Sequence, residues 1–245
     1  RQFASCSLLL TLLLCTCACA GTPPIPTSPV PQDVTGSEVR ADTPPSVDEI
    51  RIRRELALAL LDENEYAAAW DHLEFVLQHG GDSWWLHLGA AQICLYWRLD
   101  YDCVRHHAER ALVLRPDNVR AWVYLGQAAE DEGEIDTAMD FYQRVVSGRP
   151  DEIGIAIRLS QLLSRRDRHA EAVELMWRTL NAHPSEPQVM LQMATLVESE
   201  DPEMAETLLA RTAEHHENQL HAYGYLVRFY RRQGRDEDAN QLEEW

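Results

Sequence analysis

The sequence of 245 residues contains no lysine, and this absence restricts what the chain can bind. All 22 of its basic residues are arginines, against 40 aspartates and glutamates, so the formal net charge is -18. Binding to nucleic-acid phosphates requires a basic stripe or patch, which this composition does not supply. The sequence therefore argues against nucleic acid as a partner and predicts a strongly hydrated, acidic surface.

Long runs in which β-branched and polar residues alternate are also missing. Such runs mark half-buried strands, so we expect almost no sheet. Hydrophobic residues nevertheless make up 45% of the chain, which is ordinary for a globular protein. The sequence predicts an all-α fold.

The motifs that carry catalysis are absent as well. There is no Gly-rich phosphate loop and no Cys-x2-Cys pair, and His216 and His221 are five residues apart where the zinc-protease helix needs four. The other His-rich stretches, 105–107 and 215–216, are interpreted as solvated helix faces. We expect no catalytic residue, no metal site and no cofactor.

What is present begins with an export signal in residues 1–20: a basic start, an apolar run over 8–14 and a tail of small residues. Two processing outcomes stay open. A signal peptidase would cut after Ala20, whereas the resemblance to lipoprotein signals implies lipidation of Cys17 or Cys19. Residues 21–47 hold seven of the twelve prolines and lack apolar periodicity, so they are predicted to form a tether.

The stretch 119–152 carries the clearest pattern in the chain. Trp122, Leu125 and Gly126 lie in a first helix, Ala138 lies on the inner face of a second helix, and Pro150 ends the unit. This spacing resembles the tetratricopeptide repeat. Related spacings recur over residues 50–81, 82–118, 153–186, 187–219 and, in part, 220–245.

The resemblance implies a right-handed superhelical solenoid of helix-turn-helix repeats over residues 48–245, with a concave face that binds protein segments. In the family this face is lined by fixed positions of each first helix. The corresponding residues here are Leu86, Val123, Gln127, Ile157, Gln161 and Leu191. The alternative is that packing of neighbouring helices buries the apolar members of this stripe.

The second repeat is about three residues too long, which places an enlarged turn near residues 99–102. Cys94 and Cys103 flank this turn, and in an oxidising periplasm they would form a disulfide; the alternative is two separate core thiols. Aromatic residues around it form a second candidate surface, although packing within the turn would explain them equally: Trp84, Tyr96, Trp97 and Tyr101. A cluster of arginines makes the last repeat locally basic: Arg228, Arg231, Arg232 and Arg235.

These features together predict a non-catalytic interaction protein of the bacterial cell envelope, whose partner is another envelope protein or a peptide segment of one. A lipid anchor would hold it at the periplasmic face of the outer membrane, while simple cleavage would release it into the periplasm. Signal, tether and about six repeats resemble the architecture of the pilotin-type lipoproteins of type IV pilus biogenesis. A general periplasmic scaffold is the alternative, and a metal-dependent enzyme is a remote one.

Overall fold

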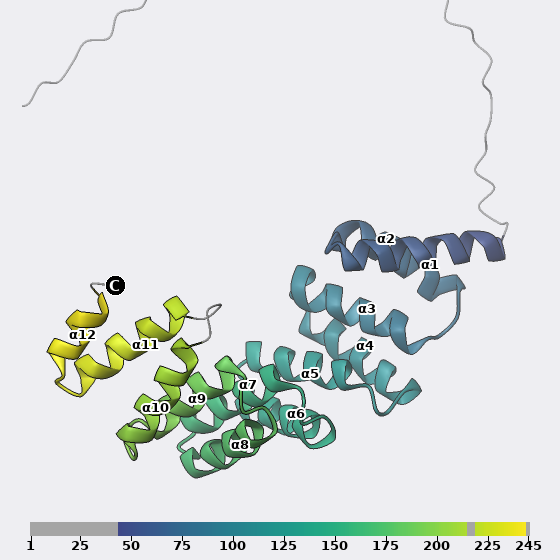
Figure 1. Ribbon diagram of the computed structural model, residues 1–245. Coiled ribbons are helices and arrows are strands. Elements are labelled where there is room, and N and C mark those ends of the chain that lie inside the picture. The colour runs from purple at the N-terminus through teal and green to yellow at the C-terminus, as the bar shows by residue number, and fades with distance from the viewer. Residues whose placement is uncertain (1–43, 215–218, 244–245) are drawn as a thin grey trace, which may run out of the picture. The chain divides into compact units, whose positions relative to one another are not determined.

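The structure, a computed structural model, describes residues 44–214 and 219–243. The predicted export signal, the predicted tether up to residue 43 and the His215–His216 pair therefore lie outside the described residues. Within those ranges the chain has helices and turns but no strand, so the all-α prediction is confirmed (Figure 1). The elements are α1 (Val47–Asp62), α2 (Tyr66–His79), α3 (Trp84–Ile93), the π-helix η1 (Cys94–Arg98), α4 (Tyr101–Leu114), α5 (Val119–Asp131), α6 (Ile135–Gly148), α7 (Ile153–Arg165), α8 (His169–Ala182), α9 (Pro187–Val197), α10 (Pro202–Ala213), α11 (Gln219–Arg232) and α12 (Asp236–Glu243).

Several helices begin at a residue whose side chain caps the free backbone N–H groups of the first turn. Asn118 accepts from the N–H of Ala121 before α5, and Asp100 accepts from the N–H of Cys103 before α4. Ser46 and Asp201 do the same before α1 and α10. Such a cap contributes about 1 kcal/mol and fixes where the helix starts.

The turn within each helix pair repeats the same backbone geometry. A residue with positive φ ends the first helix in four of the pairs: Asn64, Gly133, Asp167 and Gly234. The next residue then donates its N–H to a carbonyl five positions earlier, as from Glu134 to Ala129 at 2.8 Å and from Arg168 to Leu163 at 2.9 Å. This is the bond of a Schellman C-cap, and it reverses the chain so that the second helix packs against the first.

Each helix packs against the one before it in sequence, and first helices of neighbouring pairs also touch, α3 with α5 and α7 with α9. The small residue at the closest approach within the third pair is Gly126. A Cβ at this position would lie 2.4 Å from the Tyr142 ring, which is itself buried. The conformation therefore needs glycine here for space, and the apolar faces bury one another along the chain in three successive clusters.

The second pair departs from the others, because its extra residues lie within the first helix. The turn was expected over residues 99–102, but α3 continues as the π-helix η1 and only Leu99 and Asp100 separate it from α4. Leu99 has a φ of 52°, and the N–H of Asp100 donates to the carbonyl of Cys94 at 3.0 Å, six residues earlier rather than five. A π turn absorbs inserted residues without breaking the helix, and it is frequent at functional sites.

Candidate partner-binding site

The predicted apolar stripe does not form one exposed surface. Leu86 has no exposed area and packs with α1 and α2 in the core, so its assignment to a binding groove was wrong. Ile157 and Leu191 are partly buried and pack against the core of the C-terminal half. Val123 is half-buried. Because each first helix is covered by helices of its own and the preceding pair, this register position lies at the edge of the core.

The two glutamines of the predicted groove belong to hydrogen bonds that connect neighbouring pairs. Gln127 accepts from the hydroxyl of Tyr96 at 3.0 Å, and the Nε2 of Gln161 donates to Gln192 at 3.3 Å. Tyr124 likewise donates to Gln92 at 3.3 Å. Polar side chains therefore tie successive first helices together along the face on which Gln127 and Gln161 were predicted.

A hollow of about 510 Å³ opens on this face, and we name it the Tyr96 hollow. Its wall comes from the π-helix and the residue after it, namely Leu95, Tyr96 and Leu99. The rest of the lining comes from α5, α6 and α7: Gln127, Glu130, Asp131, Tyr142, Gly154, Ile155 and Arg158. The inserted π turn thus brings part of the predicted aromatic surface to the predicted groove.

The charges of the Tyr96 hollow are only partly neutralised within the chain. Arg158 pairs with Glu130, with its Nε donating to Oε2 at 2.8 Å, and this bond raises the pKa of the guanidinium further. Burial, followed by the neighbouring Glu130, raises the pKa of the Tyr142 hydroxyl, so this hydroxyl stays protonated. Asp131 is exposed and forms no ion pair or hydrogen bond with any residue that the structure describes. Its charge nevertheless helps to raise the pKa of both Arg158 and Tyr142, so the hollow offers an exposed carboxylate close to the Arg158 guanidinium.

A second hollow of about 420 Å³, the Gln161 hollow, lies farther along the same face. It is lined by Gln161, Ser164, Arg165, His169, Gln192, Thr195, Leu196 and Tyr225. The hydroxyl of Ser164 is buried without a hydrogen-bond partner among the described residues, and Arg165 has no carboxylate paired to it there. This hollow is therefore polar and carries a cation, in contrast to the Tyr96 hollow.

The predicted aromatic surface divides into two kinds of residue. Trp84 and Tyr101 are partly buried and pack against the core of the second pair, with the Arg115 guanidinium 4.7 Å above the Trp84 ring. Tyr96 and Trp97 are each 49% exposed, and of these only Tyr96 lines the hollow. Packing therefore accounts for Trp84 and Tyr101, whereas Tyr96 and Trp97 are exposed and their role as an interaction surface stays a prediction.

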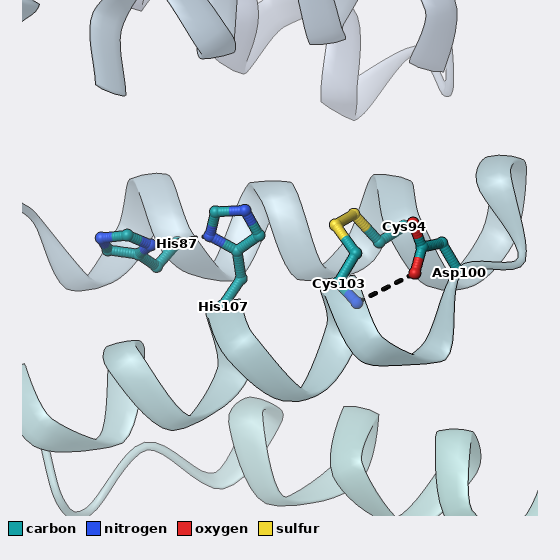
Figure 2. The surroundings of a disulfide bond; sticks show 5 residues. All are labelled: His87, Cys94, Asp100, Cys103 and His107. Atoms are coloured by element: carbon teal, nitrogen blue, oxygen red, sulfur yellow. Dashed lines mark hydrogen bonds between the residues drawn. A yellow bond between two sulfur atoms is a disulfide. The ribbon is translucent and has the colours of Figure 1, made fainter. Parts of the chain in front are cut away.

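Cys94 and Cys103 form a disulfide in the structure, with their Cα atoms 5.9 Å apart. Figure 2 shows the bond between the end of α3 and the first turn of α4, with Asp100 bonded to the backbone of Cys103. The bond encloses η1, Leu99 and Asp100 in one short loop. It therefore holds the segment that carries Tyr96.

The same two helices hold a histidine pair that the sequence analysis did not identify. The Nδ1 atoms of His87 and His107 lie 2.8 Å apart (Figure 2), and the Nε2 of His87 lies 2.6 Å from Asp82, which also pairs with Arg110. Burial lowers the pKa of His107 to about 4 and lowers that of His87 as well. The expectation of a solvated face at 105–107 was therefore wrong for His107. Its burial depends on His87, which lies twenty residues away in the sequence, so the local pattern around residue 107 could not indicate it.

The remaining sequence predictions concern charge and metal. The arginines of the last repeat are largely engaged: Arg231 with Glu243, Arg232 with Glu198, Arg235 with Glu206 and Asp238, and Arg228 over the ring of Tyr225. In the part of the chain that the structure describes, no group of three or more His, Cys, Asp or Glu side chains is placed to hold a metal ion. None of the described helices combines the length and hydrophobicity that crossing a bilayer needs.

The helix pairs of this chain are similar to those of known repeat proteins. A tetratricopeptide-repeat family model matches residues 105–153. A search of curated proteins found no match. Among solved structures, PilF of Pseudomonas aeruginosa is similar with a TM-score of 0.64 at 16% identity, over 80% of this chain and 89% of PilF.

Two structures of MamA are also similar. MamA of Desulfovibrio magneticus RS-1 has a TM-score of 0.56 at 14% identity, over 67% of this chain and 93% of MamA. MamA of AMB-1 has a TM-score of 0.58 at 21% identity, over 70% of this chain and 94% of MamA. At these identities the structures show the fold. Together with the repeat match and the recurring helix pairs, they support the resemblance to the tetratricopeptide-repeat family and show that the chain has the fold of those repeat structures.

Proposed function

We propose that this chain is a non-catalytic scaffold that captures a segment of another envelope protein in the Tyr96 hollow and helps that protein assemble. The observation that carries the proposal is the composition of the hollow. Tyr96 and Leu99 supply an exposed apolar wall, Gln127 an amide, and Asp131 an exposed carboxylate. Aromatic side chains at the edge of a concavity are the usual anchors of protein interfaces.

The chemistry of the hollow selects the partner segment. An apolar side chain of that segment would pack on Tyr96 and Leu99, and its lysine or arginine would pair with Asp131. The Gln127 amide has donor and acceptor positions for a backbone group in addition to the bond from Tyr96. The favoured partner is therefore an extended segment that carries an apolar residue close to a basic one.

The location of the proposed function rests on the N-terminal sequence. Residues 1–20 resemble a lipoprotein signal, and a proline-rich tether precedes the repeats. A lipid anchor at Cys17 or Cys19, followed by a tether, would hold the solenoid at the periplasmic face of the outer membrane. This arrangement resembles that of pilotin-type lipoproteins, and a similarity of fold to PilF over 80% of the chain supports the comparison.

Capture of the partner tests the scaffold role. Wild-type protein is immobilised, incubated with detergent-solubilised envelope, and the retained proteins are identified by mass spectrometry. Tyr96→Ala is expected to lower recovery of the partner roughly tenfold or more, since it removes an aromatic anchor. Trp97→Ala is the matched control, because Trp97 is equally exposed but does not line the hollow. Equal recovery by the two variants would remove the hollow from the function.

A separate experiment tests the anchor. Cells expressing the protein are labelled with a clickable palmitate analogue, in the wild type and in Cys17→Ala and Cys19→Ala variants. Labelling that is lost in one variant identifies the modified cysteine; a single acyl chain binds membranes only marginally, whereas two or more anchor stably. If the protein is unlabelled and begins at Gly21, the lipid anchor is contradicted and the scaffold is secreted instead.

A further inference from the structure

A third concavity lies between α6 and α8, the second helices of two neighbouring pairs. This α6–α8 pocket has a volume of about 220 Å³ and is lined by Gln143, Val146, Ser147, Pro150, Ala156, Leu175, Arg178, Thr179 and Ala182. It shares no residue with the Tyr96 hollow or the Gln161 hollow. A ligand bound here would therefore not occupy the site of the proposed function.

The interior of the pocket presents mainly apolar groups to a ligand. Val146, Ala156 and Leu175 are buried and present only hydrocarbon. The hydroxyl of Thr179 donates to the carbonyl of Leu175 at 3.0 Å, and Gln143 donates to Ser147 at 3.4 Å. The polar side chains of the lining thus already have partners within the protein.

Arg178 is the exception. It is the one charged residue of the lining, and it lies exposed at the rim. Within the described residues it forms no ion pair, not even with Glu174 one turn earlier on α8, whereas Arg166 and Arg168 nearby in sequence both pair with carboxylates. A guanidinium left unpaired beside an apolar pocket favours a carboxylate as its partner.

The volume decides what can enter. Pockets that bury whole small-molecule ligands measure about 300–1,000 Å³, and 220 Å³ corresponds to roughly seven molecules of liquid water. The pocket therefore fits one apolar side chain and not a larger ligand. We propose that the α6–α8 pocket is a second docking site, which takes an apolar side chain of a partner protein segment while a neighbouring carboxylate of that segment pairs with Arg178.

N-acetyl-leucine tests this proposal, because one small molecule carries both the apolar side chain and the carboxylate. Two probes separate these parts: N-acetyl-leucinamide lacks the carboxylate, and N-acetylglycine lacks the side chain. Binding is followed by backbone amide shifts in NMR spectra of the full chain. We expect N-acetyl-leucine to shift amides of α6 and α8 with a Kd on the order of millimolar. Both other probes should bind at least about threefold more weakly.

Two variants locate the site. Arg178→Gln should abolish the preference for N-acetyl-leucine over N-acetyl-leucinamide, and Ala182→Leu, at an exposed rim position, should block binding of both by filling the pocket. Arg165→Gln, in the Gln161 hollow, is the control and should leave binding unchanged. Circular dichroism verifies that each variant folds.

The proposal would be overturned by no shift at about 20 mM probe, by equal binding of acid and amide, or by shifts confined to helices that do not line the pocket. Octanoate binding more tightly than N-acetyl-leucine would also overturn it, because the pocket would then select an acyl chain. Loss of capture in the Tyr96→Ala variant does not depend on any of these outcomes, so the two sites are tested separately.

Discussion

The hydroxyl of Tyr96 donates a hydrogen bond to Oε1 of Gln127 and so connects the π turn of the second helix pair to the first helix of the third. These residues are 31 positions apart, and the sequence analysis placed them on two different candidate surfaces. The π-helix continues α3 far enough for Tyr96 to reach α5. The proposed binding site therefore depends on an insertion in the preceding repeat.

Gly126→Leu should destabilise the fold by overpacking the third helix pair. A Cβ at Gly126 would already lie 2.4 Å from the buried Tyr142 ring, so the larger side chain should cost roughly 1–3 kcal/mol or more. The midpoint of urea unfolding, followed by circular dichroism, measures this cost. Gly224→Ala is the control: its Cβ would meet nothing within 4 Å on α11, and replacing a mid-helix glycine should add about 0.5–1 kcal/mol. An unchanged midpoint for Gly126→Leu would contradict the close approach.

The repeat spacing predicted the helix pairs because each rule is local. Each rule concerns residues of one repeat: the close approach of two helices at Gly126, the inner helix face at Ala138, and the end of the second helix near Pro150. The same reasoning failed at Leu86 and His107, because the burial of Leu86 depends on α1 and α2 and that of His107 on a partner in α3. The length excess of the second repeat was visible, but whether a loop or a π turn absorbs it depends on tertiary contacts of Cys94 and Tyr96.

Glutamate substitutions distinguish the core from the exposed edge of the predicted stripe. Leu86→Glu should unfold the protein or cost on the order of 3 kcal/mol or more, because it buries an unpaired carboxylate and removes core packing. Val123→Glu, at a half-buried position, should cost about 1 kcal/mol or less. Thermal melts of the two variants provide the comparison. Similar melting temperatures would mean that the two positions are equally exposed.

Stability should fall as the pH falls from about 6.5 to 4, with a contribution from His107. Its pKa in the folded protein is about 4, chiefly through burial and then through the nearby His87, His106 and Arg98, while the unfolded chain has an ordinary histidine. The unfolded state therefore binds the proton first, and stability is lost across this interval. The full shift would correspond to about 3 kcal/mol, and solvent screening of the partly exposed ring reduces this to about 1–2 kcal/mol.

Urea unfolding at pH 7 and pH 4.5 measures this contribution. His107→Gln should lose less stability between the two pH values than the wild type, whereas His79→Gln, at an exposed position outside the groups that lower the pKa of His107, should lose as much as the wild type. Comparing variants in this way subtracts the carboxylates that titrate in the same interval. An identical loss in all three proteins would show that His107 is accessible to protons in the folded state.

The last prediction concerns the Cys94–Cys103 bond in the purified protein. Trypsin cuts after Arg54, Arg98 and Arg105, so the two cysteines fall on separate peptides, 55–98 and 99–105. If the protein is alkylated and digested without reductant, the two peptides should appear as one linked species that separates on reduction. Two separate, alkylated peptides would show that the thiols are free.

The same bond should matter for both stability and capture. Closing a loop of this size contributes roughly 2–3 kcal/mol in the chain-entropy account, so Cys94→Ser with Cys103→Ser should lower the free energy of unfolding by that amount. Because the loop also carries Tyr96, the double variant should recover less partner than the wild type even at temperatures where it remains folded. Leu209→Ala, which removes a buried side chain of α10 outside the lining of the hollow and costs roughly 2–5 kcal/mol without opening this loop, is the matched control. Equal capture by the two destabilised variants would mean that the disulfide acts on the fold as a whole and not on the hollow.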